Sequence, residues 1–230
     1  MKDDVLARFA DGVWLDSGPV SIVGMPMRST MTVLSLDDGG VLVHSPVALT
    51  PERRAAVLAL GPVRHLYAPN TFHHTWIGEW SAAFPDARLH APRGLRAKRP
   101  DLRIDREHGT PLDPSLARAI HEVRIQGFDL EESALVHLPS RTAVVADLVH
   151  NVGRPTQLWA QLYTKAAGFY DRVAISRTLR WLAFSDRRAV RRSVDALIGE
   201  PFDRLVLGHG APLPEEARDA LADAYRWLAP

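Results

Sequence analysis

The chain is organised around residues 68–80, which read APNTFHHTWIGEW. This stretch places two adjacent histidines, His73 and His74, beside an acid and two tryptophans. It follows residues 63–68, a short apolar run that reads as a buried strand, and it leads into helical spacing. Loop side chains converge beyond the carboxyl ends of strands, so α/β folds place ligands and metals there. The pattern predicts a functional site, and the simpler alternative is a polar turn that begins a helix.

The composition narrows the class of protein. Hydrophobic residues make up 46% and charged residues 24% of 230 residues, as in an ordinary globular protein. The net charge of +1, with arginines spread over several predicted helices, gives no field that favours nucleic acid. The chain has no cysteine, which excludes disulfides, thiolate zinc sites and a cysteine nucleophile. Any metal must therefore be held by His, Asp or Glu.

The length and hydropathy set further expectations. The first residues lack the apolar core of a signal peptide, and no run of roughly eighteen apolar residues occurs. We therefore expect a cytoplasmic protein with a small-molecule partner and with no nucleic-acid or membrane partner. Residues 1–230 are long enough for one large domain, and nothing in the sequence forces a second.

The hydrophobic pattern predicts a mixture of strands and helices. Residues 12–18 and 20–23 are β-prone, and residues 30–44 form a hairpin around Asp37-Asp38-Gly39-Gly40. Thr50 followed by Pro51 predicts the start of a helix that ends near Leu60. Residues 92–114 are expected to form a long surface connection. Further strands are predicted at 63–68, 87–91, 121–125, 133–138, 142–147 and 202–207, and helices before Phe84, over 157–182 with a break at Gly168, from Ser185 to Ile198, and over 215–228.

Five polar side chains follow the ends of four predicted strands: His44, the pair His73 and His74, Asp147 and His209. Imidazole and carboxylate are the metal ligands left when thiols are absent, and a rigid sheet fixes their geometry. Each residue also has a structural alternative: His44 caps a hairpin, and Asp147 bonds backbone N–H groups of a loop. His209 lies between two glycines, which allow the imidazole to approach another group closely. The sequence predicts a metal site built from these five residues.

Three segments resemble motifs of the metallo-β-lactamase superfamily. Residues 142–148, TAVVADL, resemble the strand that ends in a metal-bridging aspartate, and residues 205–210, LVLGHG, resemble the last strand and its Gly-His-Gly ligand turn. Residues 70–78 stand where that family carries H-x-H-x-D-H. The resemblance covers most of the chain. It implies an α/β fold, an αβ/βα sandwich of two mixed β-sheets flanked by helices, with the 30–44 hairpin among its opening strands.

The same comparison shows where the sequence departs from the family pattern. With Gly78 aligned to the family glycine, the four ligand positions read Thr71, His73, Thr75 and Trp76, so one histidine remains. No histidine stands near Phe128, where the family has its next ligand, and His44-Ser45-Pro46 replaces an Asp-x-Gly turn. The usual two-metal site cannot be assembled from these positions.

Two interpretations follow from the resemblance. In the first, which we favour, His44, His73 or His74, Asp147 and His209 hold one divalent ion, zinc or iron, with a water in the open position, and the protein hydrolyses a small ester, lactone, amide or thioester. Asp147 would then orient the attacking water, and His44 would protonate the leaving group. In the second, the protein is an inactive binding or scaffold module without metal, with Trp76 filling the space of a lost ligand. The apolar helices after Gln157 either line a pocket or form a homodimer face, and their spacing does not separate these alternatives.

Overall fold

Two β-sheets form the centre of the computed structural model, which describes residues 5–22 and 24–228. The first sheet has seven strands in the order β1-β2-β3-β4-β5-β6-β7, and the second has four in the order β11-β10-β9-β8. Pairing is parallel from β4 to β7 and between β10 and β11, and antiparallel elsewhere. The strands are β1 Ala7–Ala10, β2 Val13–Ile22, β3 Met25–Ser35, β4 Val41–His44, β5 Val63–Tyr67, β6 Arg88–Ala91, β7 Arg106–Glu107, β8 Ile120–Arg124, β9 Ser133–His137, β10 Thr142–Val144 and β11 Arg204–Val206.

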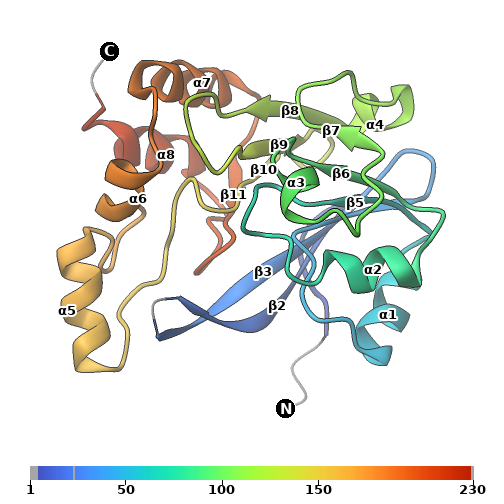
Figure 1. The fold of residues 1–230 in the computed structure, drawn as a ribbon, viewed down its shortest axis with the longest axis horizontal. Coiled ribbons are helices and arrows are strands. Elements are labelled where there is room, and N and C mark those ends of the chain that lie inside the picture. The colour runs from blue at the N-terminus through green and yellow to red at the C-terminus, as the bar shows by residue number, and fades with distance from the viewer. Residues whose placement is uncertain (1–4, 23, 229–230) are drawn as a thin grey trace.

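Helices cover the outer face of each sheet (Figure 1). Side chains of α1, α2 and α3 pack on the first sheet through Val57, Ile77, Trp80 and Leu95. Helices α7 and α8 pack on the second sheet, while α5 and α6 lie at one end of the molecule. The fold is therefore an αβ/βα sandwich, which confirms the predicted class. The helices are α1 Pro51–Leu58, α2 Ile77–Ala83, α3 Leu95–Lys98, α4 Pro114–Ala119, α5 Leu158–Ala167, α6 Arg177–Leu182, α7 Arg187–Gly199 and α8 Ala217–Tyr225.

Most predicted elements are present, and the local chemistry behind them is visible. Thr50 caps α1 by accepting a hydrogen bond from the Arg53 amide, with Pro51 at the first helical position. Gly168 ends α5 in the left-handed conformation, with φ of 83°. The predicted connection 92–114 is wrong in part. Its buried Leu95 anchors α3, and its residues 106–107 add β7 to the edge of the first sheet.

The N-terminal strands also differ from the prediction. Residues 13–22 form one strand, β2, instead of two short ones, because β2 pairs with β3 along its whole length. Position 23, the end of the second predicted strand, lies outside the described residues. The tip of this long β2–β3 hairpin reaches beyond the sheet toward the end of the molecule that carries α5 (Figure 1). The hairpin tip thereby supplies side chains to a cavity at that end.

A row of polar side chains crosses the inter-sheet face of the first sheet. In the register of the parallel strands, His44 lies beside Tyr67, Tyr67 beside His90, and His90 beside Arg106. Glu122 of the second sheet accepts hydrogen bonds from the Tyr67 hydroxyl at 2.6 Å and from Arg106 at 2.6 Å. These contacts satisfy buried polar groups that would otherwise destabilise the core.

This row makes stability depend on pH. Burial lowers the pKa of His90 to about 2 and that of His108, stacked on Tyr67, to about 3. As the pH falls below about 6.5, these histidines become protonated in the unfolded chain but stay neutral in the folded protein. The free energy of unfolding therefore decreases by up to about 1.4 kcal/mol per pH unit for each histidine. Urea unfolding between pH 7 and pH 5 measures this slope. We expect His108→Gln to reduce it; an equal slope in the parent protein and the variant contradicts the account.

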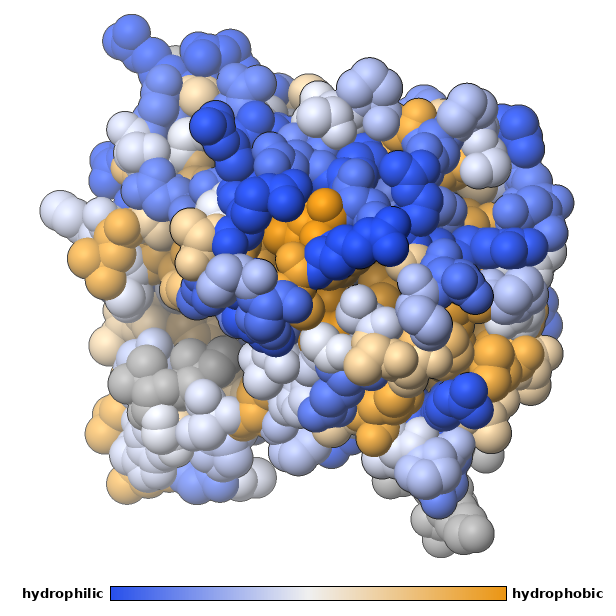
Figure 2. All heavy atoms as spheres, turned by 45° about the vertical axis from the view of Figure 1, so that its right-hand side comes forward, coloured by the Kyte–Doolittle hydropathy of each residue, from blue (hydrophilic) through white to orange (hydrophobic). Residues whose placement is uncertain are grey.

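Figure 2 shows how hydrophilic and apolar side chains are distributed over one face of the molecule. Hydrophilic side chains predominate in the upper part of this view, and apolar side chains are more frequent in its centre and lower part. No helix of the described residues is long and apolar enough to cross a bilayer.

Candidate metal centre

The loop between β5 and α2 holds His73 in place. The side-chain oxygen of Asn70 accepts hydrogen bonds from the backbone N–H groups of Phe72 and His73, both at 2.8 Å. This Asx-type turn fixes the backbone directly after the strand. The Nδ1 atom of His73 lies 2.7 Å from the Oγ atom of Ser45, which follows β4 with φ of 50°. The imidazole is thereby oriented from both sides, with its Nε2 atom toward the cavity.

His209 comes from the turn after β11. Its Nδ1 atom donates a hydrogen bond of 2.9 Å to the backbone carbonyl of Arg28 on β3. The flanking glycines are required by close approach, as the sequence indicated: a Cβ atom on Gly208 would lie 2.7 Å from the carbonyl oxygen of Ala146 and 2.9 Å from Cε1 of His73. Gly210 has φ of 101° against the backbone of residue 151. The turn thus brings His209 next to His73.

Asp147 is held by a buried polar network behind the site. Its Oδ2 atom accepts a hydrogen bond of 2.8 Å from the amide of Asn70, whose amide also donates to Glu132 at 3.0 Å. Glu132, fully buried, accepts from the backbone N–H groups of residues 146, 147 and 148. Burial and the neighbouring Asp147 raise the pKa of Glu132 to about 7. This network fixes the carboxylate of Asp147 with little freedom to rotate.

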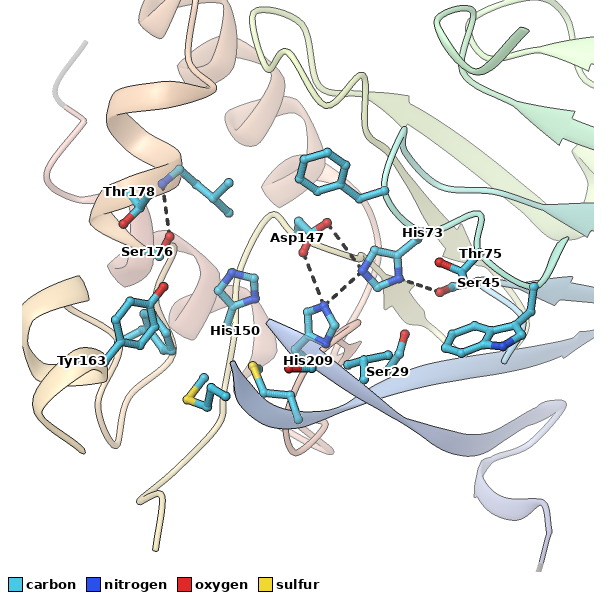
Figure 3. A pocket seen from close by; sticks show the side chains of 18 of the residues that line it. Ser29, Ser45, His73, Thr75, Asp147, His150, Tyr163, Ser176, Thr178 and His209 are labelled. Atoms are coloured by element: carbon cyan, nitrogen blue, oxygen red, sulfur yellow. Dashed lines mark hydrogen bonds and ion pairs between the residues drawn. The ribbon is translucent and has the colours of Figure 1, made fainter. Parts of the chain in front are cut away.

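Three side chains converge at one point (Figure 3). The two Nε2 atoms of His73 and His209 are 3.2 Å apart; the Oδ2 atom of Asp147 lies 3.5 Å from that of His73, and its Oδ1 atom lies 3.6 Å from that of His209. In a tetrahedral zinc site with bonds of about 2.0–2.1 Å, neighbouring donor atoms are about 3.3–3.4 Å apart. Each of these separations is close to that spacing, and one donor atom from each residue lies within 4.8 Å of the other two, so His73, Asp147 and His209 form a group that could hold a metal ion.

The charges of this group also fit a cation. Because His209 Nδ1 carries the hydrogen given to Arg28, its Nε2 atom presents a lone pair when the ring is neutral. Burial favours neutral His73, but the Asp147 carboxylate outweighs burial and raises the pKa of His73. Burial and the His73 ring lower the pKa of His209, and the histidines hold the pKa of Asp147 well below its ordinary value. A positive charge among these acceptor atoms is therefore favoured, and a divalent ion supplies it.

The structure does not bring the other two predicted ligands to this point. His44 lies on the face of β4 that it shares with Leu42, toward the inter-sheet core, where it stacks on Tyr67. Neither of its ring nitrogens has a hydrogen-bond partner among the described residues, and burial lowers its pKa to about 3. His74 turns toward α3, where its Nδ1 atom is 3.5 Å from Arg99. His44 does not reach the three donors because successive side chains of β4 point to opposite faces of the sheet. His74 does not reach them because its ring lies beside the cationic Arg99.

Two site residues were missed by the sequence analysis. His150 lines the cavity with its ring centroid 5.8 Å from that of His209, and its Nδ1 atom is buried without a partner among the described residues. Ser45 contacts His73, although its neighbour His44 attracted the prediction. His150 stands three residues after Asp147, and this closeness in sequence was the available signal for it. Nothing in the sequence marked Ser45.

The three donors lie at the edge of a cavity of about 360 Å³. Its walls are mostly apolar, and no Lys or Arg is among the lining residues that the structure describes. Figure 3 shows His150 between the donors and the α5–α6 end, from which Tyr163, Ser176 and Thr178 project. Among the described residues, the lining comprises Val20, Ser21, Met25, Met27, Ser29, Ser45, Pro46, Phe72, His73, Thr75, Trp76, Asp147, His150, Tyr163, Phe169, Ser176, Thr178, Leu179 and His209.

A second group of possible ligands, His65, His90 and Asp113, lies elsewhere on the first sheet. Its surroundings are cationic, because Arg88 pairs with Asp113 and Arg106 lies 3.4 Å from Nδ1 of His90. The His65 and His90 rings also satisfy each other through a 2.9 Å hydrogen bond. This group fits a structural polar network better than a metal site.

Replacing Gly208 by alanine tests the close packing of the centre. The new methyl group would press on the Ala146 backbone and on His73, so we expect a loss of about 1–3 kcal/mol in the free energy of unfolding. We also expect zinc affinity to fall by about 10-fold or more, since one donor shifts. Gly199→Ala is the matched control, because a Cβ atom there meets nothing within 4 Å. Urea unfolding and zinc titration measure both effects, and equal values for the two variants would show that His73 is not packed as described.

Comparison with solved structures identifies the class of fold. The chain has a metallo-β-lactamase-like fold. Similar structures include a metallo-β-lactamase from Pontibacter korlensis (11% identity, TM-score 0.65, covering 96% of this chain and 98% of that one) and one from Hirschia baltica (9%, 0.66, 98% and 97%). A third is the mono-zinc form of FIM-1 from Pseudomonas aeruginosa (12%, 0.64, 98% and 96%). At these identities the likeness concerns the fold alone.

The family itself is shown by a sequence model. Residues 11–192 match the family described as "Domain of unknown function (DUF4336)", and the chain belongs to that family. A search of curated proteins found no match.

Proposed function

We propose that this protein is a metal-dependent hydrolase with a mononuclear site formed by His73, Asp147 and His209. The observation that carries this proposal is the convergence of their donor atoms at 3.2–3.6 Å beside an apolar cavity. When bound, a divalent ion such as zinc or iron supplies Lewis acidity, which makes water nucleophilic near neutral pH and polarises a carbonyl group. Three protein donors leave a position open to substrate, the arrangement of catalytic rather than structural zinc sites.

Other residues of the chain orient the three metal donors and bind the substrate. Arg28 and Ser45 fix the two imidazoles, and Asn70 fixes Asp147, so the donors need little rearrangement. Phe72 and Trp76 line the cavity next to the donors and bind the apolar part of a substrate. Burial lowers the pKa of His150 to about 4, so its neutral imidazole is available near neutral pH to exchange a hydrogen bond with the substrate. His150, rather than the enclosed His44, is the imidazole placed for that task.

The cavity favours a neutral, apolar acyl compound as substrate: a small ester, thioester, lactone or amide. An anionic substrate would find no Lys or Arg among the described lining residues and would meet the Asp147 carboxylate. Trp76 also lines the cavity. If the protein is instead an inactive binding module, Trp76 would contact a ligand that is held without metal.

A hydrolysis assay separates these functions. The metal-stripped protein is loaded with zinc or iron and tested against neutral p-nitrophenyl esters, thioesters, lactones and anilides. We expect a chelator to abolish turnover and added metal to restore it. We also expect His150→Gln to lower turnover at constant metal content. If the fully loaded protein hydrolyses none of these compounds yet binds one of them in the cavity, the hydrolase is wrong and the binding module is supported.

A further inference from the structure

Large apolar side chains are exposed on the two helices that close one end of the cavity. Within residues 5–22 and 24–228, five of the seven exposed large hydrophobic side chains stand on α5 and α6. Leu158 and Leu162 are one helical turn apart on α5, and exposure reaches 79% at Trp181. A surface of this kind usually marks an interaction site. We call it the α5–α6 face; it comprises Leu158, Trp159, Leu162, Trp181 and Leu182.

Basic side chains are frequent in the segment that carries this face. Residues 154–188 contain seven Lys or Arg and two Asp, a net charge of +5 in a chain whose net charge is +1. Both acids are engaged: Asp171 pairs with Arg154 at 2.6 Å, and Asp186 caps α7. The guanidinium of Arg187 lies 5.9 Å from the ring of Trp181, so charge and apolar surface are adjacent. The segment is therefore strongly positive where it is most apolar.

A cleft beside α6 concentrates this charge. Arg172, Arg177, Arg180 and Arg226 line it together with Trp227, and Asp223, the acid among its described lining residues, pairs with Arg226. Arg180 stacks 4.1 Å from the Trp227 ring. Burial lowers the pKa of Arg180, and the charges of its arginine neighbours lower it further. An anionic group in this cleft would relieve the repulsion among the guanidinium groups.

We propose that the α5–α6 face docks on an anionic lipid surface. Tryptophan and leucine enter the boundary between headgroups and acyl chains, while arginines bind the phosphate groups of the headgroups. A second copy of the chain fits this face less well, because a two-fold contact would set two segments of +5 charge against each other. Docking on the surface requires no membrane-spanning helix. It departs from the expectation that a membrane is not a partner.

The α5–α6 face lies on the same two helices that line the cavity, so docking would bring the cavity close to the lipid. Tyr163 of α5 and Leu179 of α6 line the cavity, while Leu162 and Trp181, one and two residues from them in the sequence, are exposed. A docked molecule would hold one wall of the cavity against the lipid, from which apolar acyl substrates could enter. This last step rests on the proposed hydrolase, whereas docking itself does not.

Vesicle co-sedimentation of the full chain tests the inference without any activity measurement. We expect binding to phosphatidylcholine vesicles that contain about 30% phosphatidylglycerol, a headgroup charge that recruits basic segments, and at least about 10-fold weaker binding to phosphatidylcholine alone. Trp181→Ala combined with Leu182→Ser should lower the binding by about 10-fold or more. Leu58→Ser, at the other exposed leucine, on α1, is the matched control and should bind like the parent.

Three results would overturn the inference. One is equal binding of the parent protein to both kinds of vesicle, or binding to neither. Another is a stable dimer in sedimentation equilibrium that the Trp181→Ala, Leu182→Ser variant dissociates, which would assign the face to a second copy. The third is release from vesicles by inorganic phosphate at an ionic strength where chloride has no effect, which would assign the cleft to a soluble phosphate compound. Hydrolysis of a short, water-soluble ester should be unchanged in the variant, so failure of docking and failure of the hydrolase remain distinguishable.

Discussion

Replacing Asp147 by asparagine is expected to lower the affinity for zinc by more than about 10²-fold, beyond the 10- to 100-fold loss typical of a supporting residue. Asparagine keeps the size of the side chain but removes the only anionic donor of the group. The charge that raises the pKa of His73 and favours a cation at this point disappears with it. Because turnover depends on the bound ion, we expect hydrolysis to fall in the same proportion or more.

Zinc titration of the metal-stripped protein measures this effect. Asp203→Asn is the matched control, since Asp203 is an exposed aspartate paired with Arg141 at the surface and should leave zinc affinity within about two-fold, as exposed ion pairs contribute little. Equal zinc affinity in the parent protein and in Asp147→Asn would place the ion elsewhere in the chain.

Replacing Glu132 by alanine is expected to reduce the free energy of unfolding by about 4 kcal/mol, the second large effect. The substitution removes the acceptor of three backbone N–H groups, those of Ala146, Asp147 and Leu148, and of the Asn70 amide. Each buried donor left without an acceptor costs about 1–3 kcal/mol, and water that enters the new space recovers part of this. The loop that carries Asp147 should also lose its fixed geometry.

Urea unfolding of the metal-free protein tests this expectation, because metal binding would add to the measured stability. Glu132→Gln should give an intermediate loss, since one side-chain oxygen remains but an amide N–H₂ group faces backbone N–H groups. Glu200→Ala, which removes a partly exposed surface partner of His121, should change stability by less than about 1 kcal/mol. A loss for Glu132→Ala no larger than for Glu200→Ala would contradict the network.

The fold could be predicted because local signals agree with the global pattern. The 30–44 hairpin, the Thr50–Pro51 helix start and the Gly168 helix end each have a chemistry that is readable within a few residues. The short elements α3 and β7 could not be predicted in this way. They depend on contacts between distant segments, such as the pairing of His90 with Arg106.

The candidate site was predictable in part. The sequence placed His73, Asp147 and His209 at strand ends, and the structure brings these three together. It could not show that the His44 ring faces the inter-sheet core, because a strand end does not reveal which face its last side chain takes once the turn begins. Glu132 and Asn70 hold Asp147 from 15 and 77 residues away, and such tertiary support leaves no local pattern.

The metal content of the protein, purified without chelators, is the most direct test of a mononuclear centre at His73, Asp147 and His209. Elemental analysis of the parent protein should find about one equivalent of zinc or iron, and His209→Ala and His73→Ala should each retain little of it, whereas His44→Phe should retain the full amount. Less than about a tenth of an equivalent of any transition metal in the parent, or an undiminished content in His209→Ala, would contradict the proposed metal centre.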